Sequence, residues 1–562
     1  MVGSQKKRDL ITLAIVLVGI VLLNLLSDKV FTRFDFTKEK RYTLSPISKL
    51  LMNGLPQEVK ITVYLEGSDL PPGFKRLQSA THDMLIDLEA YSHGSSIQYE
   101  FINPLAGVAE QQQNDVIKDL QGQGIDATNL SIKTDNGLTQ KIIFPSAMVS
   151  ANGKQIAVKL LQTRTGLSSD EVLNNSIQNL EYAFVSAIKK VCADGKPEIG
   201  FTEGHNELSD LQLNDAMKSL SDGFLVGRVD LSTISMASLQ KVKMLVIPKP
   251  DKPFTEAEKF KLDQYIMHGG RVVWSIDQVS AELDSLHGHQ QLAFNKQLNL
   301  DDQLFTYGIR INYDMIADMS SAQIPLTTGD ISGQPQIQMV PWLFYPIFMP
   351  LSKNPIVKNL DGIRSEFAST IDTLGTKGTQ KTVILASSPY NRKLGAPHML
   401  SLQMVEEVPD PKTFRSAPKT VGVLLEGTFK SDFANRPIPP GITEKVNQAD
   451  ESIPTKMIVF SDGDLFKNQV ASDGSPYPLG FDHFTRESYG NKNLLLNIAD
   501  YMTDDSGLIS LRNKEIQLRL LDRTRIRSEK MFWQLINNVI PIALVLIFAI
   551  FQHYMRKRKY AH

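Results

Sequence analysis

Two apolar segments lie at opposite ends of this sequence, residues 10–26 and 533–551, and nothing between them is long and apolar enough to cross a bilayer. The first, LITLAIVLVGIVLLNLL, rises about 25 Å as a helix, which with its flanks suffices for a hydrocarbon core of roughly 30 Å. The sequence therefore predicts two transmembrane helices, with one large water-soluble body anchored at both ends.

Basic residues set the expected orientation of the two spans. Lys6, Lys7 and Arg8 precede the first span, and the basic run RKRK follows the second, so both termini should be cytoplasmic. Basic residues between 512 and 530 argue against this, but long domains translocate largely regardless of charge. A cleaved signal peptide is the alternative, although no Ala-x-Ala-like site follows the first segment.

Composition indicates an ordinary folded exterior. The chain is 42% hydrophobic and 22% charged with a formal net charge of -1, which gives no sign of a nucleic-acid binder. Its single cysteine, Cys192, cannot form an internal disulfide and is expected as a small buried residue at a helix end.

Residues 30–166 are predicted to form a first domain with the element order β-α-β-α-β-β. Ser45 and Pro46 indicate the start of a short helix that Gly54 closes, and Asn152-Gly153 between apolar runs indicates a hairpin. This order is typical of a thioredoxin-like domain, yet the Cys-x-x-Cys of redox enzymes is absent. We therefore expect a scaffold.

A second domain is predicted from residues 167–280 and 455–505. A helix capped at Ser168 or Ser169 leads into strands that alternate with helices, which favours a doubly wound parallel sheet. Residues 281–454 are expected as an inserted α+β region and residues 506–530 as a juxtamembrane connector. The predicted fold class is thus α/β.

Polar side chains gather at the expected carboxyl ends of the strands, where such sheets hold ligands. Lys249 ends one of these strands, and the candidate ligand-binding residues are Glu203, His205, Glu207, Asp277, Asp462 and Asp464. The alternative is that the segment from Glu203 to Glu207 caps and solvates a loop and that Asp462-Gly463-Asp464 is simple turn chemistry.

Two further features indicate contact with partners. PWLFYPIFMP, residues 341–350, is expected as a rigid loop presenting Trp342, Phe344 and Tyr345, unless these rings fill a core. In the second span, Asn537, Asn538 and Pro541 place polar groups at one level of the helix, which favours contact with other helices unless that level is wet.

The sequence contains no P-loop and no nucleophile-elbow motif. The nearest approach to a P-loop, GTKGTQKT at residues 375–382, has Gln380 where glycine is required, and no nucleophile elbow Gly-x-Ser-x-Gly is evident. We expect no enzyme activity, no metal and no cofactor.

The basic anchor, the stretch RFDFTKEKRYTLSPISKLL, then VKITVYLEG, GFTEGHNE and the terminal span with its basic tail together resemble a known family. The resemblance is to the gliding-motility GldG family, auxiliary subunits of ABC transporters in Bacteroidota. It implies partnership with a separate multi-span permease and a cytoplasmic ATPase. It also implies location in the bacterial inner membrane, with the bulk in the periplasm, and a sugar-binding-like or amidotransferase-like (GIFT) α/β core.

Two functional hypotheses follow. The first is a non-catalytic periplasmic subunit of an ABC-type complex associated with gliding motility. The alternative is a cell-envelope carbohydrate-binding protein or hydrolase, which would use Glu203, His205 and Asp462 in one crevice facing an envelope glycan.

Overall fold

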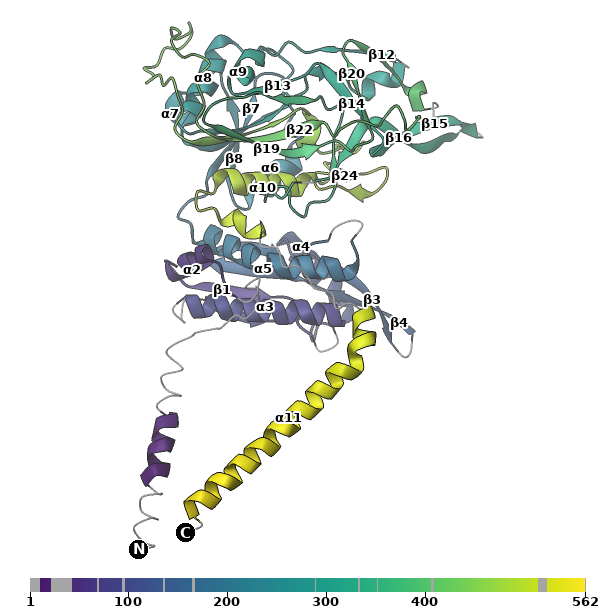
Figure 1. Ribbon diagram of the computed structural model, residues 1–562. Coiled ribbons are helices and arrows are strands. Elements are labelled where there is room, and N and C mark those ends of the chain that lie inside the picture. The colour runs from purple at the N-terminus through teal and green to yellow at the C-terminus, as the bar shows by residue number, and fades with distance from the viewer. Residues whose placement is uncertain are drawn as a thin grey trace. The chain divides into compact units, whose positions relative to one another are not determined.

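The computed structural model describes residues 11–21, 43–67, 70–92, 97–134, 137–163, 167–288, 290–331, 334–350, 352–405, 409–513 and 523–560. It is a mixed α/β protein (Figure 1). Residues 42–514 fold into one body, and the long C-terminal helix belongs to a separate unit, which is treated by itself below.

The first domain is built on a four-stranded sheet with the order β2-β1-β5-β6. Its strands are β1 (Val59–Val63), β2 (Ile97–Phe101), β5 (Ser146–Ala151) and β6 (Lys154–Lys159). β1 and β2 are parallel because α3 (Pro72–Tyr91) crosses between them, and β5 runs antiparallel to β1. The β5–β6 hairpin turns at Asn152 and Gly153, both with positive φ, which confirms the Asn-Gly prediction.

Helix boundaries in this region follow the capping signals. α2 (Pro46–Asn53) is capped by the Ser45 side chain and ends at Gly54. α5 (Ser169–Cys192) begins with a capping box between Ser168 and Glu171. α4 (Glu110–Gly122) is followed by a hairpin of β3 (Thr128–Thr134) and β4 (Gly137–Ile143) that was not predicted.

A seven-stranded sheet forms the second core, with the order β19-β22-β23-β10-β9-β7-β8. Five strands are parallel: β7 (Glu198–Glu203), β8 (Leu225–Asp230), β9 (Val242–Pro248), β10 (Arg271–Ser275) and β23 (Thr455–Phe460). β23 comes from the second part of the predicted domain, residues 455–505, and pairs with β10. β19 (Thr379–Ala386) and β22 (Thr420–Gly427) extend it in antiparallel orientation, although they lie within the range predicted as an insertion.

Apolar side chains of this sheet are buried on both faces. One face packs with α6 (Asn214–Ser221) and α10 (Asn491–Thr503). The other packs with α7 (Met236–Leu239), α8 (Glu256–Met267) and α9 (Asp301–Thr306). Figure 1 shows α6 and α10 together below the sheet and α7, α8 and α9 near one another at its upper left.

A third core joins several small sheets. They contain β11 (Val279–Ser280), β12 (Gln290–Asn295), β14 (Asp314–Asp318), β15 (Ser321–Ile331), β16 (Gln334–Phe348), β20 (Asn391–Gly395) and β21 (His398–Ser401). β13 (Ile309–Ile311) pairs with β18 (Ile371–Thr373), and both pack on the face of the large sheet that α7, α8 and α9 cover. β17 (Ile363–Arg364) packs on the opposite face through Ile363, and β24 (Phe481–Asp482) and β25 (Glu487–Ser488) form a hairpin. Short 3-10 helices lie at Asp284–Gly288, Leu402–Val405, Asp464–Phe466 and Leu508–Asn513.

The aromatic segment at residues 341–350 is not a loop. Residues up to Phe348 belong to β16, which pairs with β15 through register shifts. Its pairing with β15 is irregular, which accommodates the prolines, and Trp342, Phe344 and Tyr345 are buried in the third core. The loop prediction was therefore wrong, since it gave proline more weight than the aromatic pattern.

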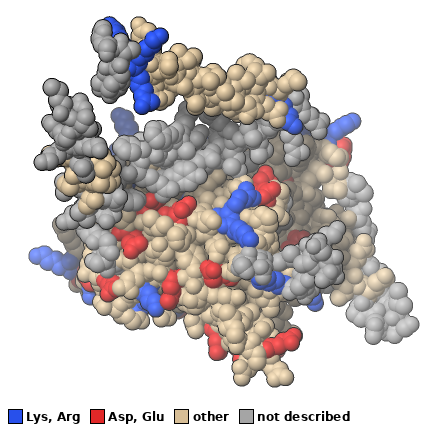
Figure 2. Space-filling model, turned by 90° about the horizontal axis from the view of Figure 1, so that it is seen from below, with Lys and Arg blue, Asp and Glu red and all other residues tan. Residues whose placement is uncertain are grey.

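α11 (Arg523–Tyr560) is one continuous helix that contains Pro541. Its part from Ser528 to Arg558 is long and apolar enough to cross a membrane. In Figure 2 this helix is a tan rod with blue side chains toward its two ends. Near the N-terminus, Ile11–Val21 forms a shorter apolar helix. The rest of that predicted span, residues 34–42 of the juxtamembrane motif and residues 514–522 of the connector lie outside the described residues.

Candidate functional site

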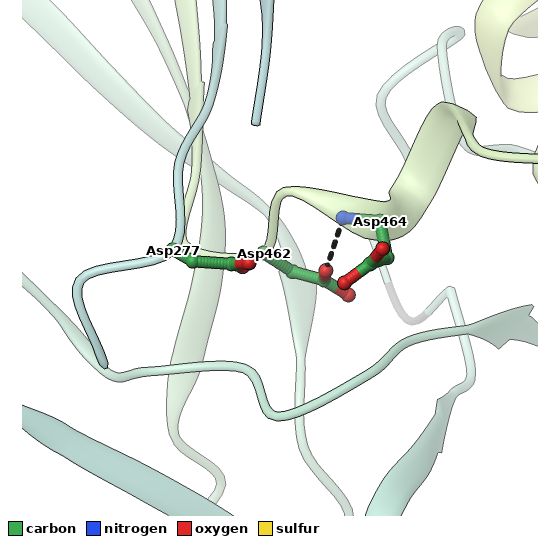
Figure 3. A group of neighbouring side chains, drawn as sticks. All are labelled: Asp277, Asp462 and Asp464. Atoms are coloured by element: carbon green, nitrogen blue, oxygen red, sulfur yellow. Dashed lines mark hydrogen bonds between the residues drawn. The ribbon is translucent and has the colours of Figure 1, made fainter. Parts of the chain in front are cut away.

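Three buried aspartates meet where β10 and β23 end. Asp277 follows β10, and Asp462 and Asp464 follow β23; because the two strands are parallel neighbours, their ends share one edge of the sheet. One carboxylate oxygen from each lies within 4.8 Å of the other two. Figure 3 shows Asp462 between Asp277 and Asp464, with the three carboxyl groups gathered together.

Lys249, at the end of β9, supplies positive charge to this cluster. Its Nζ lies 2.6 Å from Asp464 Oδ2, 2.6 Å from Glu282 Oε1 and 3.4 Å from Asp277 Oδ2. Lys467 adds a second ammonium 2.9 Å from Asp464 Oδ1. The cluster therefore contains an ion-pair network in which two lysines face three acidic side chains, and Asp462 lies beside it.

Backbone and hydroxyl donors fix the carboxylates in place. The Gly463 N–H donates to Asp277 Oδ1 at 2.6 Å, and the Asp464 N–H donates to Asp462 Oδ1 at 2.7 Å (Figure 3). Asp462 Oδ2 accepts from the Glu366 N–H at 2.9 Å and contacts the Ser365 hydroxyl. Ser365 and Glu366 come from the range predicted as an insertion, so that range closes the site.

Gly463 is required by the close approach of Lys249. A Cβ on Gly463 would lie 2.5 Å from Lys249 Cγ and 2.7 Å from its Cβ. Lys249 itself has a positive φ of 55°, which directs its side chain into the cluster.

Burial and charge move the pKa values of these groups apart. Burial raises the pKa of Asp462 well above its usual value, and Asp464 and Asp277 raise it further. Burial also raises the pKa of Asp277 and of Glu282. Burial would raise the pKa of Asp464 too, but Lys249 and then Lys467 lower it below the usual value. Burial alone would lower the pKa of Lys249, but Asp464, Asp277 and Glu282 raise it.

This chemistry favours a structural role for the cluster over metal binding. Three carboxylates could hold a hard cation, but the Lys249 ammonium already contacts two of them at ion-pair distance. Such a network is specific in its geometry and is strongly destabilised when one partner is removed.

His205 lies in a second, separate group. Its ring stacks on Phe254 at 3.8 Å, its Nε2 lies 3.2 Å from Glu258 Oε2, and its Nδ1 lies 3.5 Å from Glu207 Oε1. Burial lowers the pKa of His205, but the hydrogen bond to Glu207 and the charge of Glu258 outweigh it, so the pKa is raised. The buried imidazole between two carboxylates ties the loop after β7 to the first turn of α8.

The predicted strand-end residues thus do not form one constellation. Glu203 is half-exposed and accepts from Arg228 Nε at 3.2 Å. His205 contacts Glu207 and, on α8, Glu258, while Asp462 contacts Ser365, Glu366 and Asp464. The geometry that a hydrolase using Glu203, His205 and Asp462 together would need is not observed among the described contacts.

The predicted partner-contact residues have two different environments. Trp342, Phe344 and Tyr345 are each at most 3% exposed, and they pack in the third core beside Phe367. In this conformation they fill a core, as the alternative interpretation had it. Asn537, Asn538 and Pro541 lie in α11 with exposed side chains.

Several residues of these groups were missed in the sequence. Glu258 is the third helical residue of the capping box at Thr255, a signal that indicates helix capping but not contact with His205. Glu282 lies five positions after Asp277, and Ser365 is brought in from a distant segment. Only tertiary structure brings the last two to the aspartates.

Comparison with known proteins gives a family match over more than half of the chain. A family model described as an ABC-type uncharacterized transport system matches residues 196–498, and a domain of unknown function matches residues 38–150. An uncharacterized protein of Borreliella burgdorferi is 20% identical over 558 residues, which cover 98% of each chain.

Two solved structures show weaker likeness. The mmIFT52 N-terminal domain aligns with a TM-score of 0.31 and 14% identity over 57% of this chain and 100% of that chain. A ThuA-like protein from Parabacteroides merdae aligns with a TM-score of 0.26 and 12% identity over 55% and 90% of the two chains. At these scores neither likeness carries an argument.

Proposed function

This chain belongs to the auxiliary-component family of ABC-type transport systems, and we propose that it is a non-catalytic, membrane-anchored subunit of such a complex. The observation that carries the proposal is the family match over residues 196–498, the region that contains the seven-stranded sheet. A multi-span permease and a separate cytoplasmic ATPase would be its partners.

What the chain contains and lacks supports this division of labour. Its sequence has no P-loop, and one apolar helix of membrane-spanning length is found in the part of the chain that the structure describes. A transport pathway and an ATP-driven motor would therefore come from other subunits. The charged groups at the sheet edge pair with one another, which supports a structural role for them over a catalytic one.

The finer parts of the proposal concern place and process. We propose that α11 and the N-terminal apolar segment both span the inner membrane, that the body lies in the periplasm, and that the complex serves gliding motility. We also propose that the first domain is thioredoxin-like, which its strand order β2-β1-β5-β6 supports, and that the large sheet is doubly wound. Ligand binding at the strand-end residues stays a prediction.

Affinity purification of the tagged full-length chain from its own membranes in mild detergent tests the proposal. We expect a multi-span permease and a P-loop ATPase to be retained with it. Recovery of the chain alone, under conditions that keep other membrane complexes intact, would refute the proposal.

A variant of α11 separates membrane anchoring from partner contact. Replacing Asn537 and Asn538 with leucine keeps the helix apolar and removes the polar groups at this level. If α11 contacts the permease there, less permease is recovered while membrane insertion is unchanged. Leucine in place of Gln552, a polar residue nearer the C-terminal end of α11, is the matched control.

A further inference from the structure

A cavity of about 350 Å³ lies in the first domain, apart from the groups described above. It is lined by Glu66, Gln78, Ser79, His82, Asp83 and Phe101. Glu66 follows β1, Phe101 ends β2, and the other four lie on one face of α3. Because β1 and β2 are parallel, the cavity is at the carboxyl ends of two parallel strands, where such sheets leave room for ligands.

The frame of this cavity is held by buried packing. The other face of α3 buries Leu77, Leu85 and Leu88 in the core of the domain, so the exposed face is fixed relative to the strands. His82 lies 5.8 Å from the Tyr99 ring and 5.7 Å from the Phe101 ring. Of these three rings, His82 and Phe101 line the cavity.

The polar lining is acidic. It contains two carboxylates, from Glu66 and Asp83, and no lysine or arginine. Glu66 accepts a hydrogen bond from Gln78 Nε2 at 2.9 Å, which holds its carboxylate at the rim. An anionic ligand would be repelled here, whereas a cation would meet two carboxylates and the faces of aromatic rings.

The spacing of the donors favours an organic cation over a metal ion. Among the described residues, only Asp277, Asp462 and Asp464 place three metal-ligand atoms of His, Cys, Asp or Glu within 4.8 Å of one another. Glu66, His82 and Asp83 are therefore too widely spaced to coordinate one ion together. A guanidinium or alkylammonium group is larger and can reach separate carboxylates while its alkyl part lies on a ring.

We propose that this cavity binds a guanidinium or primary ammonium group, with Asp83 and Glu66 as charge partners and Phe101 as the ring beneath it. The group can come from a small free amine or from an arginine or lysine side chain of a protein. Lys141 Nζ lies 3.8 Å from the position that a Cβ on Gly67 would take, and Gly67 directly follows Glu66. The Lys141 ammonium therefore competes with the ligand for the Glu66 carboxylate.

Calorimetric titration of the full-length chain in detergent tests this proposal with three probes. They are ethylguanidinium, the peptide acetyl-Gly-Arg-Gly-amide and the neutral sugar methyl glucoside. We expect the two cations to bind and the sugar not to bind, with affinity that falls as salt is raised. Tighter binding of the peptide than of ethylguanidinium identifies a protein side chain as the source, and equal binding identifies a small amine.

Matched variants locate the binding. Asp83→Asn and Glu66→Gln should each weaken ethylguanidinium binding about threefold and together about tenfold, in line with ion pairs at a surface worth up to about 1 kcal/mol each. Lys141→Met should strengthen it. Asp119→Asn, which changes an exposed carboxylate on α4 of the same domain, should leave it unchanged.

Three results would overturn the proposal: no binding of either cation, binding that the Asp83 and Glu66 variants leave unchanged, or binding of the sugar that is as tight as that of the cations. Both changed side chains are exposed, so the variants should keep the wild-type melting temperature, and a loss of binding is then not a loss of folding. The outcome is independent of whether a permease or an ATPase is recovered with the chain.

Discussion

Removing the positive charge of Lys249 should strongly destabilise the second core. In Lys249→Met the side chain keeps the Cβ and Cγ that approach Gly463, but Asp277 and Glu282 lose an ammonium at 3.4 and 2.6 Å. Breaking a buried ion pair by removing one partner typically costs about 3–5 kcal/mol. Because Lys467 still faces Asp464, we expect the lower part of that range, about 3 kcal/mol at pH 7.

The cost should shrink as pH falls. Without Lys249, the native-state pKa values of Asp277 and Glu282, already raised by burial, rise further. A carboxyl group whose pKa is higher in the folded than in the unfolded state binds more protons when folded, so lowering the pH stabilises the fold. The difference between wild type and variant should therefore be larger at pH 7 than at pH 5.

Urea unfolding followed by tryptophan fluorescence measures both quantities, since Trp274 is fully buried in β10 next to the cluster. Lys243→Met, an exposed position on the same strand β9, is the control and should change stability by less than about 0.5 kcal/mol. Adding Glu282→Gln to Lys249→Met should recover at least about 1 kcal/mol. A Lys249→Met cost below about 1 kcal/mol, or one that is equal at both pH values, would refute the ion-pair account.

Three further expectations concern the same body. His205→Gln should lower the free energy of unfolding more at pH 6 than at pH 9, measured with urea. The pKa of His205 is raised in the folded state, so its contribution to stability is complete below the unfolded-state pKa of about 6.5 and is lost as the pH rises through the folded-state pKa. An equal loss at both pH values would contradict this. Gly463→Ala should cost about 1–3 kcal/mol by overpacking against Lys249, and a neutral effect on the melting temperature would contradict the close approach. Chelator or added magnesium should leave the melting temperature unchanged, because Lys249 provides the charge at the aspartates; a rise with magnesium would indicate a metal site.

Capping residues in the sequence were sufficient to predict where several helices begin. Ser45, Ser168 and Thr255 mark helix starts that the structure has, because capping depends on residues a few positions away. The late return of β23 to the sheet was also predictable, since its apolar run ends in the same polar chemistry as β10.

The sequence did not predict how β16, β19 and β22 pair, because these pairings join strands that are distant in the sequence or irregular in register. β19 and β22 extend the sheet in antiparallel orientation, and nothing in their own residues distinguishes them from strands of a separate insertion. β16 was predicted to be a loop because proline has no N–H to donate to a regular β-ladder. The pairing of β16 with β15 has register shifts and accommodates its prolines.

The candidate site divides in the same way. Asp277, Asp462 and Asp464 could be placed together because the carboxyl ends of neighbouring parallel strands share one edge. The partners that determine their chemistry, Ser365 and Glu282, come from outside those strands. The separation of His205 from Asp462 likewise depends on the position of α8, which supplies Glu258.

ATP hydrolysis by the affinity-purified full-length chain tests the central claim most directly. The chain has no P-loop of its own, so any ATPase activity that copurifies with it must come from bound partners. In the variant with leucine at positions 537 and 538, this activity should fall together with the amount of permease recovered. The account predicts that activity in the wild-type preparation. A homogeneous preparation of the chain, free of ATPase activity and of any multi-span protein, would contradict it.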